Sequence, residues 1–230
     1  MSPDAHPAAV SLRGILYYTR LDEPAAHEAL ESLAARLPYA RLQSLDAAPH
    51  ARVASLTGIA LAMQALRDLL EREVSPSALR FPAGGKPYMP GAPDFSVSHS
   101  GALVACAAAW HGVVGLDIES DPRDEEISLR AVCSDTEMTW AREAGTRSVW
   151  VRKEAALKAL GGTLTEIATV RLNAAGARFR RRQFFCHDIA IEPACVGCIM
   201  ASDPAASFAP QARSAARVIF GYDRRGDRRA

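Results

Sequence analysis

Residues 95–119 read FSVSHSGALVACAAAWHGVVGLDIE, and this stretch decides the fold. It contains three segments with the composition of strands, Phe95–Ser98, Ala102–Trp110 and Val113–Glu119, with a turn at His111–Gly112 between the last two. The middle segment is an unbroken run of small apolar residues, which is typical of a buried strand. The sequence therefore predicts strands in the middle of the chain, the last of which carries acidic residues.

The flanks of this stretch predict helices and further strands. Before it, a strand is expected at Leu12–Thr19 and helices at Ala25–Leu37 and His50–Leu70. After it, we expect two helices and then three strands: Asp135–Ala144 and Ser148–Leu160, then Ile167–Leu172, Ala177–Phe185 and Ala194–Ala201. This order of elements indicates an α+β fold rather than a regular strand–helix–strand repeat. It is also compatible with two similar halves that meet near residue 111.

Length, composition and charge exclude several classes of protein. The chain has 230 residues, of which 49% are hydrophobic and 23% charged, and its formal net charge is +1. The apolar share excludes a disordered chain, and the near-zero charge argues against a nucleic-acid binder. We find no signal peptide and no apolar run of about 20 residues, so we expect a cytoplasmic protein with no membrane partner.

The five cysteines, an odd number without a signal peptide, indicate reduced thiols in the cytosol. Two of them form a single Cys195-Val-Gly-Cys198 motif inside an apolar stretch. Without a second pair this motif is weak as a zinc site, and two buried thiols in a strand are the favoured interpretation.

Two polar motifs in and before the central stretch could bind phosphate. In Gly84-Gly85-Lys86-Pro87, glycines let a ligand approach the backbone and the lysine can hold a phosphate, although a plain turn is favoured for this motif alone. The Ser98-His99-Ser100 strand end suits a phosphate-binding corner. A Ser–His–Asp hydrolase is the rival function, without a Gly-x-Ser-x-Gly motif to support it, and a capped strand end is the structural alternative.

The motif Gly115-Leu-Asp117-Ile-Glu119 carries two acidic residues on one strand. Side chains alternate along a strand, so Asp117 and Glu119 share one face while Leu116 and Ile118 point into the core. Two neighbouring carboxylates repel each other, and a divalent cation such as Mg²⁺ would relieve this repulsion. The alternative is an edge strand with a solvated acidic face, against which the buried run before it argues.

A fourth motif, Trp150-Val-Arg-Lys153-Glu154-Ala-Ala-Leu-Lys158, lies on a predicted helix. Glu154 and Lys158 are one turn apart on one face, and Trp150 lies one turn before Glu154. An exposed salt bridge is the usual explanation of an isolated Glu–Lys pair. The four motifs together, in this order along the chain, make a functional explanation the better one.

Taken together, the four motifs resemble the 4′-phosphopantetheinyl transferases, specifically the larger monomeric type that activates surfactin and enterobactin synthetases. The resemblance covers about residues 50–165. It implies a pseudo-twofold pair of similar α+β halves: residues 1–110 as the nucleotide-contacting half and residues 111–209 as the half with the metal and the base. Residues 210–230 would then form a basic, loosely ordered tail.

The resemblance implies that the phosphopantetheine arm of coenzyme A moves to a serine of an apo acyl or peptidyl carrier protein, releasing adenosine 3′,5′-bisphosphate. Asp117, Glu119 and Glu154 would bind Mg²⁺, with Mn²⁺ as an alternative. Glu154 would also be the general base, directly or through water. Lys158 would contact the phosphates and stabilise the leaving group, whereas Lys153 points away from this face.

The resemblance also assigns contacts to coenzyme A. A phosphate would meet His99 with Ser98 beside it, and the remaining contacts would be Gly85, Lys86, Pro87 and Lys158. Arg52, near the start of the long helix, would meet the 3′-phosphate, with Arg36 and Arg41 as further candidates. Ile59 stands where many members of the family have arginine, so one familiar contact is absent.

A module that binds coenzyme A without catalysis is the runner-up function, and the three carboxylates and Lys158 argue against it. The carrier proteins of this family are acidic, so an arginine cluster is a candidate steering surface, with a solvated strand face as the alternative. That cluster is Arg178, Arg180, Arg181 and Arg182. The protein is expected to act as a monomer without nucleic acid.

Overall fold

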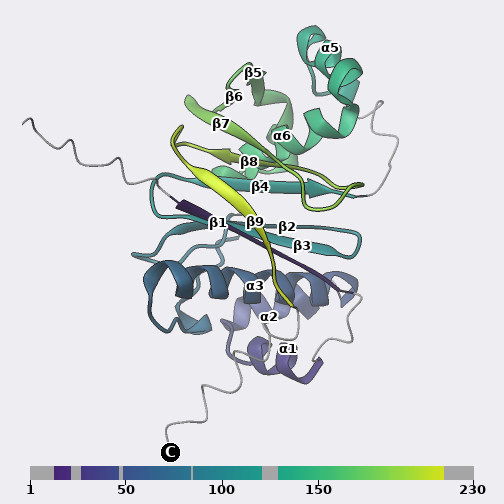
Figure 1. The fold of residues 1–230 in the computed structure, drawn as a ribbon. Coiled ribbons are helices and arrows are strands. Elements are labelled where there is room, and N and C mark those ends of the chain that lie inside the picture. Colours follow the sequence, from purple (N-terminus) through teal and green to yellow (C-terminus); the bar gives the residue numbers. More distant parts are fainter. Residues whose placement is uncertain (1–12, 22–26, 47–48, 84, 121–128, 215–230) are drawn as a thin grey trace, which may run out of the picture.

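Two β-sheets stacked face to face, with helices on both outer faces, make up this computed structural model of the protein (Figure 1). It describes residues 13–21, 27–46, 49–83, 85–120 and 129–214. One buried apolar cluster lies between the N-terminal helices and the first sheet, a second between the sheets, and a third between the second sheet and the C-terminal helices. The predicted α+β class is confirmed.

The first sheet has the strand order β2–β3–β1–β9. Its strands are β1 (Arg13–Arg20), β2 (Asp94–Ser100), β3 (Leu103–Ala109) and β9 (Ser207–Ala212). β3 is antiparallel to both neighbours and buried at every position, because helices cover one of its faces and the second sheet covers the other. Such double coverage explains its run of small apolar residues.

The second sheet is antiparallel throughout, in the order β4–β8–β7–β6–β5. Its strands are β4 (Val114–Glu119), β5 (Arg171–Asn173), β6 (Gly176–Phe179), β7 (Arg182–Ile189) and β8 (Val196–Ala201). Leu116 and Ile118 lie in the apolar cluster between the sheets, as the alternation predicts. The face of β4 that carries Asp117 is therefore the one turned towards the C-terminal helices.

The helices form the outer layers (Figure 1). They are α1 (His27–Ala34), α2 (Tyr39–Asp46), α3 (Pro49–Leu70), α5 (Asp135–Ala144) and α6 (Thr146–Ala159), with short 3₁₀ helices η1 (Pro76–Ala78) and η2 (Leu164–Thr169). The predicted bounds of α5 are confirmed, and the Ser134 side chain caps its first turn. A capping box of this kind satisfies backbone donors that have no partner within the helix.

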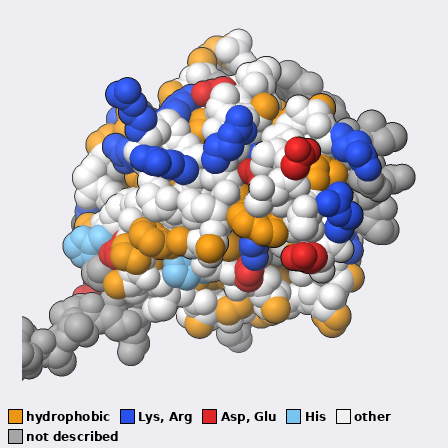
Figure 2. Space-filling model, turned by 90° about the horizontal axis from the view of Figure 1, so that it is seen from above, with side chains coloured by type: hydrophobic (Ala, Val, Ile, Leu, Met, Phe, Trp, Pro, Cys, Tyr) orange, Lys and Arg blue, Asp and Glu red, His pale blue; other side chains and the backbone are white. Residues whose placement is uncertain are grey.

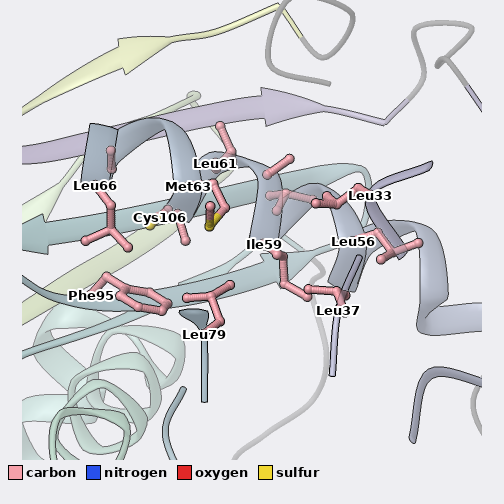
Figure 3. Close-up of a cluster of buried hydrophobic side chains, with 14 of the residues drawn as sticks. Leu33, Leu37, Leu56, Ile59, Leu61, Met63, Leu66, Leu79, Phe95 and Cys106 are labelled. Atoms are coloured by element: carbon pink, nitrogen blue, oxygen red, sulfur yellow. The ribbon is translucent and has the colours of Figure 1, made fainter. Parts of the chain in front are cut away.

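Helix α3 is the central helix of the N-terminal layer. Leu56, Ile59, Met63 and Leu66 are buried in the apolar cluster that Figure 3 shows, together with Phe95 of β2. Contrary to the sequence-based expectation, its residues Ala51–Leu70 are long and apolar enough to cross a membrane by length and composition, and 67% of the apolar window is buried inside the protein. Burial of this kind is typical of a core helix, which passes the same test of length and composition.

One predicted strand, Ala177–Phe185, is a hairpin instead. The chain turns at Arg180 and Arg181, whose φ angles are 44° and 65°, and β6 and β7 pair across this turn. Two-residue hairpin turns of positive φ usually carry Asn or Gly. Two arginines give no such signal, so the sequence was read as one strand.

Three further segments differ from their predictions. Helix α2 was not predicted, and the predicted strand Ile167–Leu172 is mostly η2, with only its end in β5. The tail expected from residue 210 begins inside β9, which pairs with β1 in the first sheet, and residues 215–230 lie outside the described residues. The chain therefore returns to its N-terminal sheet after completing the second one.

A side-chain ladder joins the two sheets where β2 and β4, each at an edge of its own sheet, run beside one another. Every second residue of β2 accepts a hydrogen bond from a backbone N–H twenty positions later. The pairs are Asp94 Oδ2 with Val114 (2.7 Å), Ser96 Oγ with Leu116 (3.0 Å), Ser98 Oγ with Ile118 (3.3 Å) and Ser100 Oγ with Ser120 (3.0 Å). The alternating serines thus satisfy edge-strand N–H groups that no neighbouring strand satisfies.

Replacing Ser96 with alanine should destabilise the protein by about 1–3 kcal/mol, because the buried N–H of Leu116 would lose its acceptor. Urea unfolding measures this change. The matched control is Ser77→Ala at an exposed position of η1, where a change within about 0.5 kcal/mol is expected. Equal effects for the two variants would show that the ladder does not stabilise the junction of the sheets.

Candidate active site

The close packing of α6 on β4 brings three acidic side chains together. Gly115 permits this approach, because a Cβ at that position would lie 1.8 Å from the carbonyl oxygen of Ala155. Asp117 and Glu119 then face Glu154 of α6, and their negative charges act on its carboxyl group. The glycine of the Gly-x-Asp-x-Glu motif is therefore a packing requirement of the acidic cluster.

Asp117 lies at the centre of this cluster and is only 2% exposed. Its Oδ1 accepts hydrogen bonds from Ser98 Oγ at 2.8 Å and from Lys158 Nζ at 2.5 Å. Its Oδ2 is also buried, and it has no hydrogen-bond partner among the residues that the structure describes. One carboxylate oxygen is thus fixed in place while the other is desolvated and available to a ligand.

The other two carboxylates differ in how they are held. Glu119 Oε2 accepts a hydrogen bond from Ser100 Oγ at 2.7 Å. Burial, together with the negative charges of Asp117 and Glu119, raises the pKa of Glu154 to about 7, although Lys158, whose Nζ lies 3.9 Å from Glu154 Oε2, opposes the rise. Glu154 therefore changes its protonation state near neutral pH.

These residues fit a hard divalent cation. The charges of Asp117 and Glu119 act on Glu154, Lys158 contacts Asp117, and one buried oxygen of Asp117 has no partner among the described residues. Oxygen ligands of this kind suit Mg²⁺ or Mn²⁺. Asp117, Glu119 and Glu154, the set that the family resemblance implies, would hold such an ion.

A cavity of about 340 Å³ adjoins the acidic cluster. Helix α3 and β2 form one side, and the loop around Lys86 and the end of α6 form the other. The lining residues are Arg41, Ser55, Ile59, Ala62, Leu79, Phe81, Gly85, Lys86, Pro87, Phe95, Ser96, Val97, His99, Lys158, Gly161 and Gly162. Both the N-terminal and the C-terminal part of the chain therefore contribute to one pocket.

The structure places most of the predicted ligand contacts on this cavity: Gly85, Lys86, Pro87, His99 and Lys158. Ser98 is not among the lining residues, because its hydroxyl points away from His99 towards Asp117. The same geometry argues against the hydrolase alternative, since the hydroxyls of Ser98 and Ser100 are engaged with β4 rather than with the imidazole.

The predicted arginines take different positions. Arg41 lines the cavity, and its guanidinium lies over the ring of Phe81 at 5.2 Å. Arg52 pairs with Glu31 at 2.8 Å and is not part of the lining, although it lies one helical turn before Ser55 on the same face of α3. Of the three candidates, only Arg41 reaches the cavity wall, and Arg36 does not.

The sequence predicts that the ammonium group of Lys86 contacts a phosphate. In the structure this group instead contacts residues at the junction of the two sheets. Its Nζ contacts the Asp94 carboxylate and donates a hydrogen bond of 2.6 Å to the carbonyl oxygen of Val114. Burial lowers the pKa of Lys86, and the charge of Asp94 opposes this. The side chain therefore stabilises the junction of the two sheets while part of the residue faces the cavity.

His99 sits on the exposed side of β2 at the cavity. Burial lowers its pKa, and the positive charge of Lys158 lowers it further. The imidazole is therefore neutral at pH 7, and it would meet a phosphate as a hydrogen-bond donor rather than as a cation.

Sequence reasoning missed Ser55, Ser96, Gly161 and Gly162 as cavity residues. The two glycines were read only as the end of a helix. Gly161 has a φ of 62°, and a Cβ there would lie 2.9 Å from the backbone nitrogen of Lys86. The two glycines are visible in the sequence, but the loop around Lys86, against which Gly161 packs, lies far away along the chain.

A match to a known protein family covers the part of the chain that holds the carboxylates. Residues 113–194 match the model of the 4′-phosphopantetheinyl transferase superfamily. The 4′-phosphopantetheinyl transferase AcpT of Salmonella typhimurium is 38% identical over 116 residues, and that of Salmonella typhi is 37% identical over 116 residues. Each alignment covers 45% of this chain and 60% of the relative.

The chain thus spans 60% of the length of the curated relatives that it matches. The region that matches the superfamily contains the residues of the acidic cluster on β4 and α6: Asp117, Glu119, Glu154 and Lys158. Residues 113–194 therefore carry the sequence pattern of the 4′-phosphopantetheinyl transferase superfamily.

Proposed function

We propose that the protein transfers the 4′-phosphopantetheine group of coenzyme A to a serine of an apo acyl or peptidyl carrier protein and releases adenosine 3′,5′-bisphosphate. It would belong to the larger monomeric type that activates peptide and siderophore synthetases, with two similar halves related by a pseudo-twofold axis, and act in the cytoplasm. The match of residues 113–194 to the superfamily and the similarity to AcpT support this proposal.

The position of Lys158 is the observation that carries the proposal. Its side chain lines the cavity, and its Nζ lies 2.5 Å from Asp117 and 3.9 Å from Glu154. A ligand in the cavity would therefore bring its phosphates against Lys158 and the acidic cluster at the same time. Transfer of a phosphoryl group needs this juxtaposition of a binding pocket, a cation site and a base.

The chain's own residues have distinct roles in the proposed reaction. Asp117, Glu119 and Glu154 would hold Mg²⁺ or Mn²⁺, which when bound neutralises charge on the pyrophosphate. Lys158 and neutral His99 would orient the phosphates from the cavity side. Ser98 keeps Asp117 in place through its 2.8 Å hydrogen bond.

Glu154 would accept the proton of the attacking serine, directly or through water. As the serine oxygen bonds to the β-phosphorus, the bond from that phosphorus to the oxygen of adenosine 3′,5′-bisphosphate breaks. Lys158 would stabilise the negative charge on that leaving oxygen. The proton of the serine therefore goes to Glu154, and the negative charge of the leaving group is stabilised by Lys158.

The surface near the hairpin of β6 and β7 is a candidate for binding an acidic carrier protein. Arg178, Arg180, Arg181 and Arg182 are exposed there, although Arg180 also pairs with Glu166 at 2.7 Å. Figure 2, viewed from the side of the C-terminal helices, shows Lys and Arg side chains gathered over part of this face. Positive charge of this kind would speed the encounter with an acidic partner at low salt.

The pKa of Glu154 predicts a pH-dependent stability for the metal-free protein. The unfolded carboxyl ionises near 4.5 and the folded one near 7, so the wild type should lose about 2 kcal/mol relative to Glu154→Gln as pH rises from 4.5 to 7. Urea unfolding in the presence of a chelator measures both curves. Saturating Mg²⁺ should remove the loss, whereas parallel curves without metal would contradict the raised pKa.

Rates with a panel of apo carrier proteins test the proposed function and its subclass. Peptide-synthetase carriers should be modified faster than a fatty-acid carrier, with coenzyme A and Mg²⁺ present. A protein that binds coenzyme A in calorimetry but modifies none of the carriers would be the binding module instead. The variant Lys158→Met should retain its fold and lose transfer, because Lys158 joins the cavity to the cluster.

A further inference from the structure

We propose that Cys186, Asp188 and Cys198 form a binding site for a thiophilic divalent cation such as Zn²⁺. Cys186 Sγ lies 3.2 Å from Cys198 Sγ and 3.3 Å from Asp188 Oδ1, and all three ligand atoms lie within 4.8 Å of one another. Two sulfur atoms with one carboxylate oxygen are a donor set that prefers Zn²⁺ to Mg²⁺.

The sheet register explains how the three ligands meet. Cys186 and Asp188 are two residues apart on β7, so they share a face, and Cys198 of β8 pairs directly with Asp188. Cys186 and Cys198 both contact the apolar cluster under α6. The three side chains are thus presented by two adjacent strands of a sheet, which is a rigid support for a metal site.

The Cys195-x-x-Cys198 motif is not the site, although it is the pair that the sequence displays. Cys195 belongs to the apolar cluster between the sheets, whereas Cys198 belongs to the one under α6. Their side chains therefore point to opposite faces of the sheet. Both thiols are buried, as the sequence predicts, and the partner of Cys198 is Cys186 from the neighbouring strand.

Arg152 of α6 is not a ligand of the proposed site, but it contacts the Asp188 carboxylate. Its Nη2 donates to Asp188 Oδ2 at 2.8 Å and its Nε donates to Oδ1 at 3.3 Å, so both oxygens are held by Arg152, and Oδ1 also accepts from Cys186 Sγ. Residues that hold a metal-binding carboxylate in this way fix its orientation. Two thiolates, the carboxylate, the guanidinium and a divalent cation also add to a neutral group, so the partly buried site carries no net charge.

Binding would release two protons. Each thiol gives its proton to the buffer as its sulfur bonds to the cation. Thiolates on a tetrahedral Zn²⁺, with Zn–S of about 2.3 Å, stand roughly 3.8 Å apart, so a small side-chain rotation from 3.2 Å suffices.

The site lies beside the acidic cluster but uses other ligands. Asp117 pairs with Cys198 across β4 and β8, so a row of residues on one sheet face runs from the carboxylates to the thiols. The hard oxygen ligands at one end of this row would prefer Mg²⁺, and the thiolates at the other end would prefer Zn²⁺. The proposal does not depend on the transferase activity, since none of its ligands belongs to the acidic cluster.

Titration of the reduced, metal-free full-length protein with Co²⁺ tests the proposal. One equivalent should give a thiolate-to-cobalt charge-transfer absorption, and Zn²⁺ should abolish it by displacement. Cys186→Ser and Cys198→Ser should each bind Co²⁺ more weakly and show at most the smaller absorption of one thiolate, and Arg152→Gln should weaken Co²⁺ binding by roughly 10–100-fold. The matched control Cys195→Ser should keep the absorption, and so should Asp117→Asn, because carboxylates give no such band.

Several results would overturn the proposal. One is a wild-type protein that shows no thiolate band with Co²⁺, and another is a band of undiminished intensity in Cys186→Ser. A third is a Cys186–Cys198 disulfide in the protein purified under reducing conditions, seen as a mass lower by two hydrogens. Circular dichroism checks the fold of each variant. If Cys198→Ser does not fold, the result for Cys186→Ser decides, because Cys186 is only partly buried.

Discussion

Replacing Glu154 with glutamine should lower kcat/KM for transfer by at least about 100-fold, while the protein stays folded. Glutamine keeps the size of the side chain but cannot accept the proton of the attacking serine or carry the charge that a cation requires. The geometry that predicts this loss is the position of Glu154 beside Asp117 and Lys158. Initial rates with a carrier protein as the varied substrate measure it.

The matched control for this variant is Glu143→Gln, at an exposed position on α5. Its kcat/KM should stay within about twofold of the wild type, since surface substitutions have small effects. Near-normal turnover of Glu154→Gln with intact Mg²⁺ binding would show that another group is the base. Loss of turnover together with loss of Mg²⁺ binding would leave Glu154 as a metal ligand and remove the evidence for its role as a base.

Replacing Lys153 with methionine should cost about 3–5 kcal/mol of stability. Lys153 is completely buried, and its Nζ lies 3.0 Å from Glu137 Oε1 and donates a 2.7 Å hydrogen bond to the carbonyl oxygen of Val170. Methionine would leave the buried carboxylate of Glu137 without its counter-charge. Urea unfolding should show the loss as a lower midpoint.

Lys158 provides the control within the same motif. Its side chain is about one-third exposed, at the edge of the cavity, so Lys158→Met should change stability far less than Lys153→Met. Activity should show the reverse order, with transfer lost in folded Lys158→Met. A stable Lys153→Met protein would contradict the structural role of the buried pair between α5 and α6.

The sequence predicts best what local patterns determine. Strands β2, β3 and β4 follow from composition and alternation, and α5 was predicted with Asp135 as its N-cap, whereas the structure has Ser134 as the N-cap and Asp135 in the first turn. The alternation on β4 also indicates which side chains reach the core and which reach the acidic cluster. Residues whose role depends on a neighbour along the same strand or helix were therefore placed correctly.

What the sequence could not predict depends on distant pairing. β9 is polar and contains a proline, and it is a strand because β1, from the opposite end of the chain, pairs with it. The strand end Ser98-His99-Ser100 was interpreted as a phosphate-binding corner, whereas all three serines of β2 accept hydrogen bonds from the edge of β4. Lys153 was set aside as pointing away from the site, and its partner Glu137 appears only when α5 packs on α6.

The mass of an apo carrier protein after incubation with this protein, coenzyme A and Mg²⁺ tests the central claim most directly. We predict a gain equal to one phosphopantetheine group, located on the carrier's acceptor serine and absent from a carrier with alanine at that position. The gain should also be absent with Asp117→Ala, which removes the buried ligand at the centre of the cluster. An unchanged mass across peptidyl and acyl carriers, with coenzyme A bound to the protein, would contradict the claim.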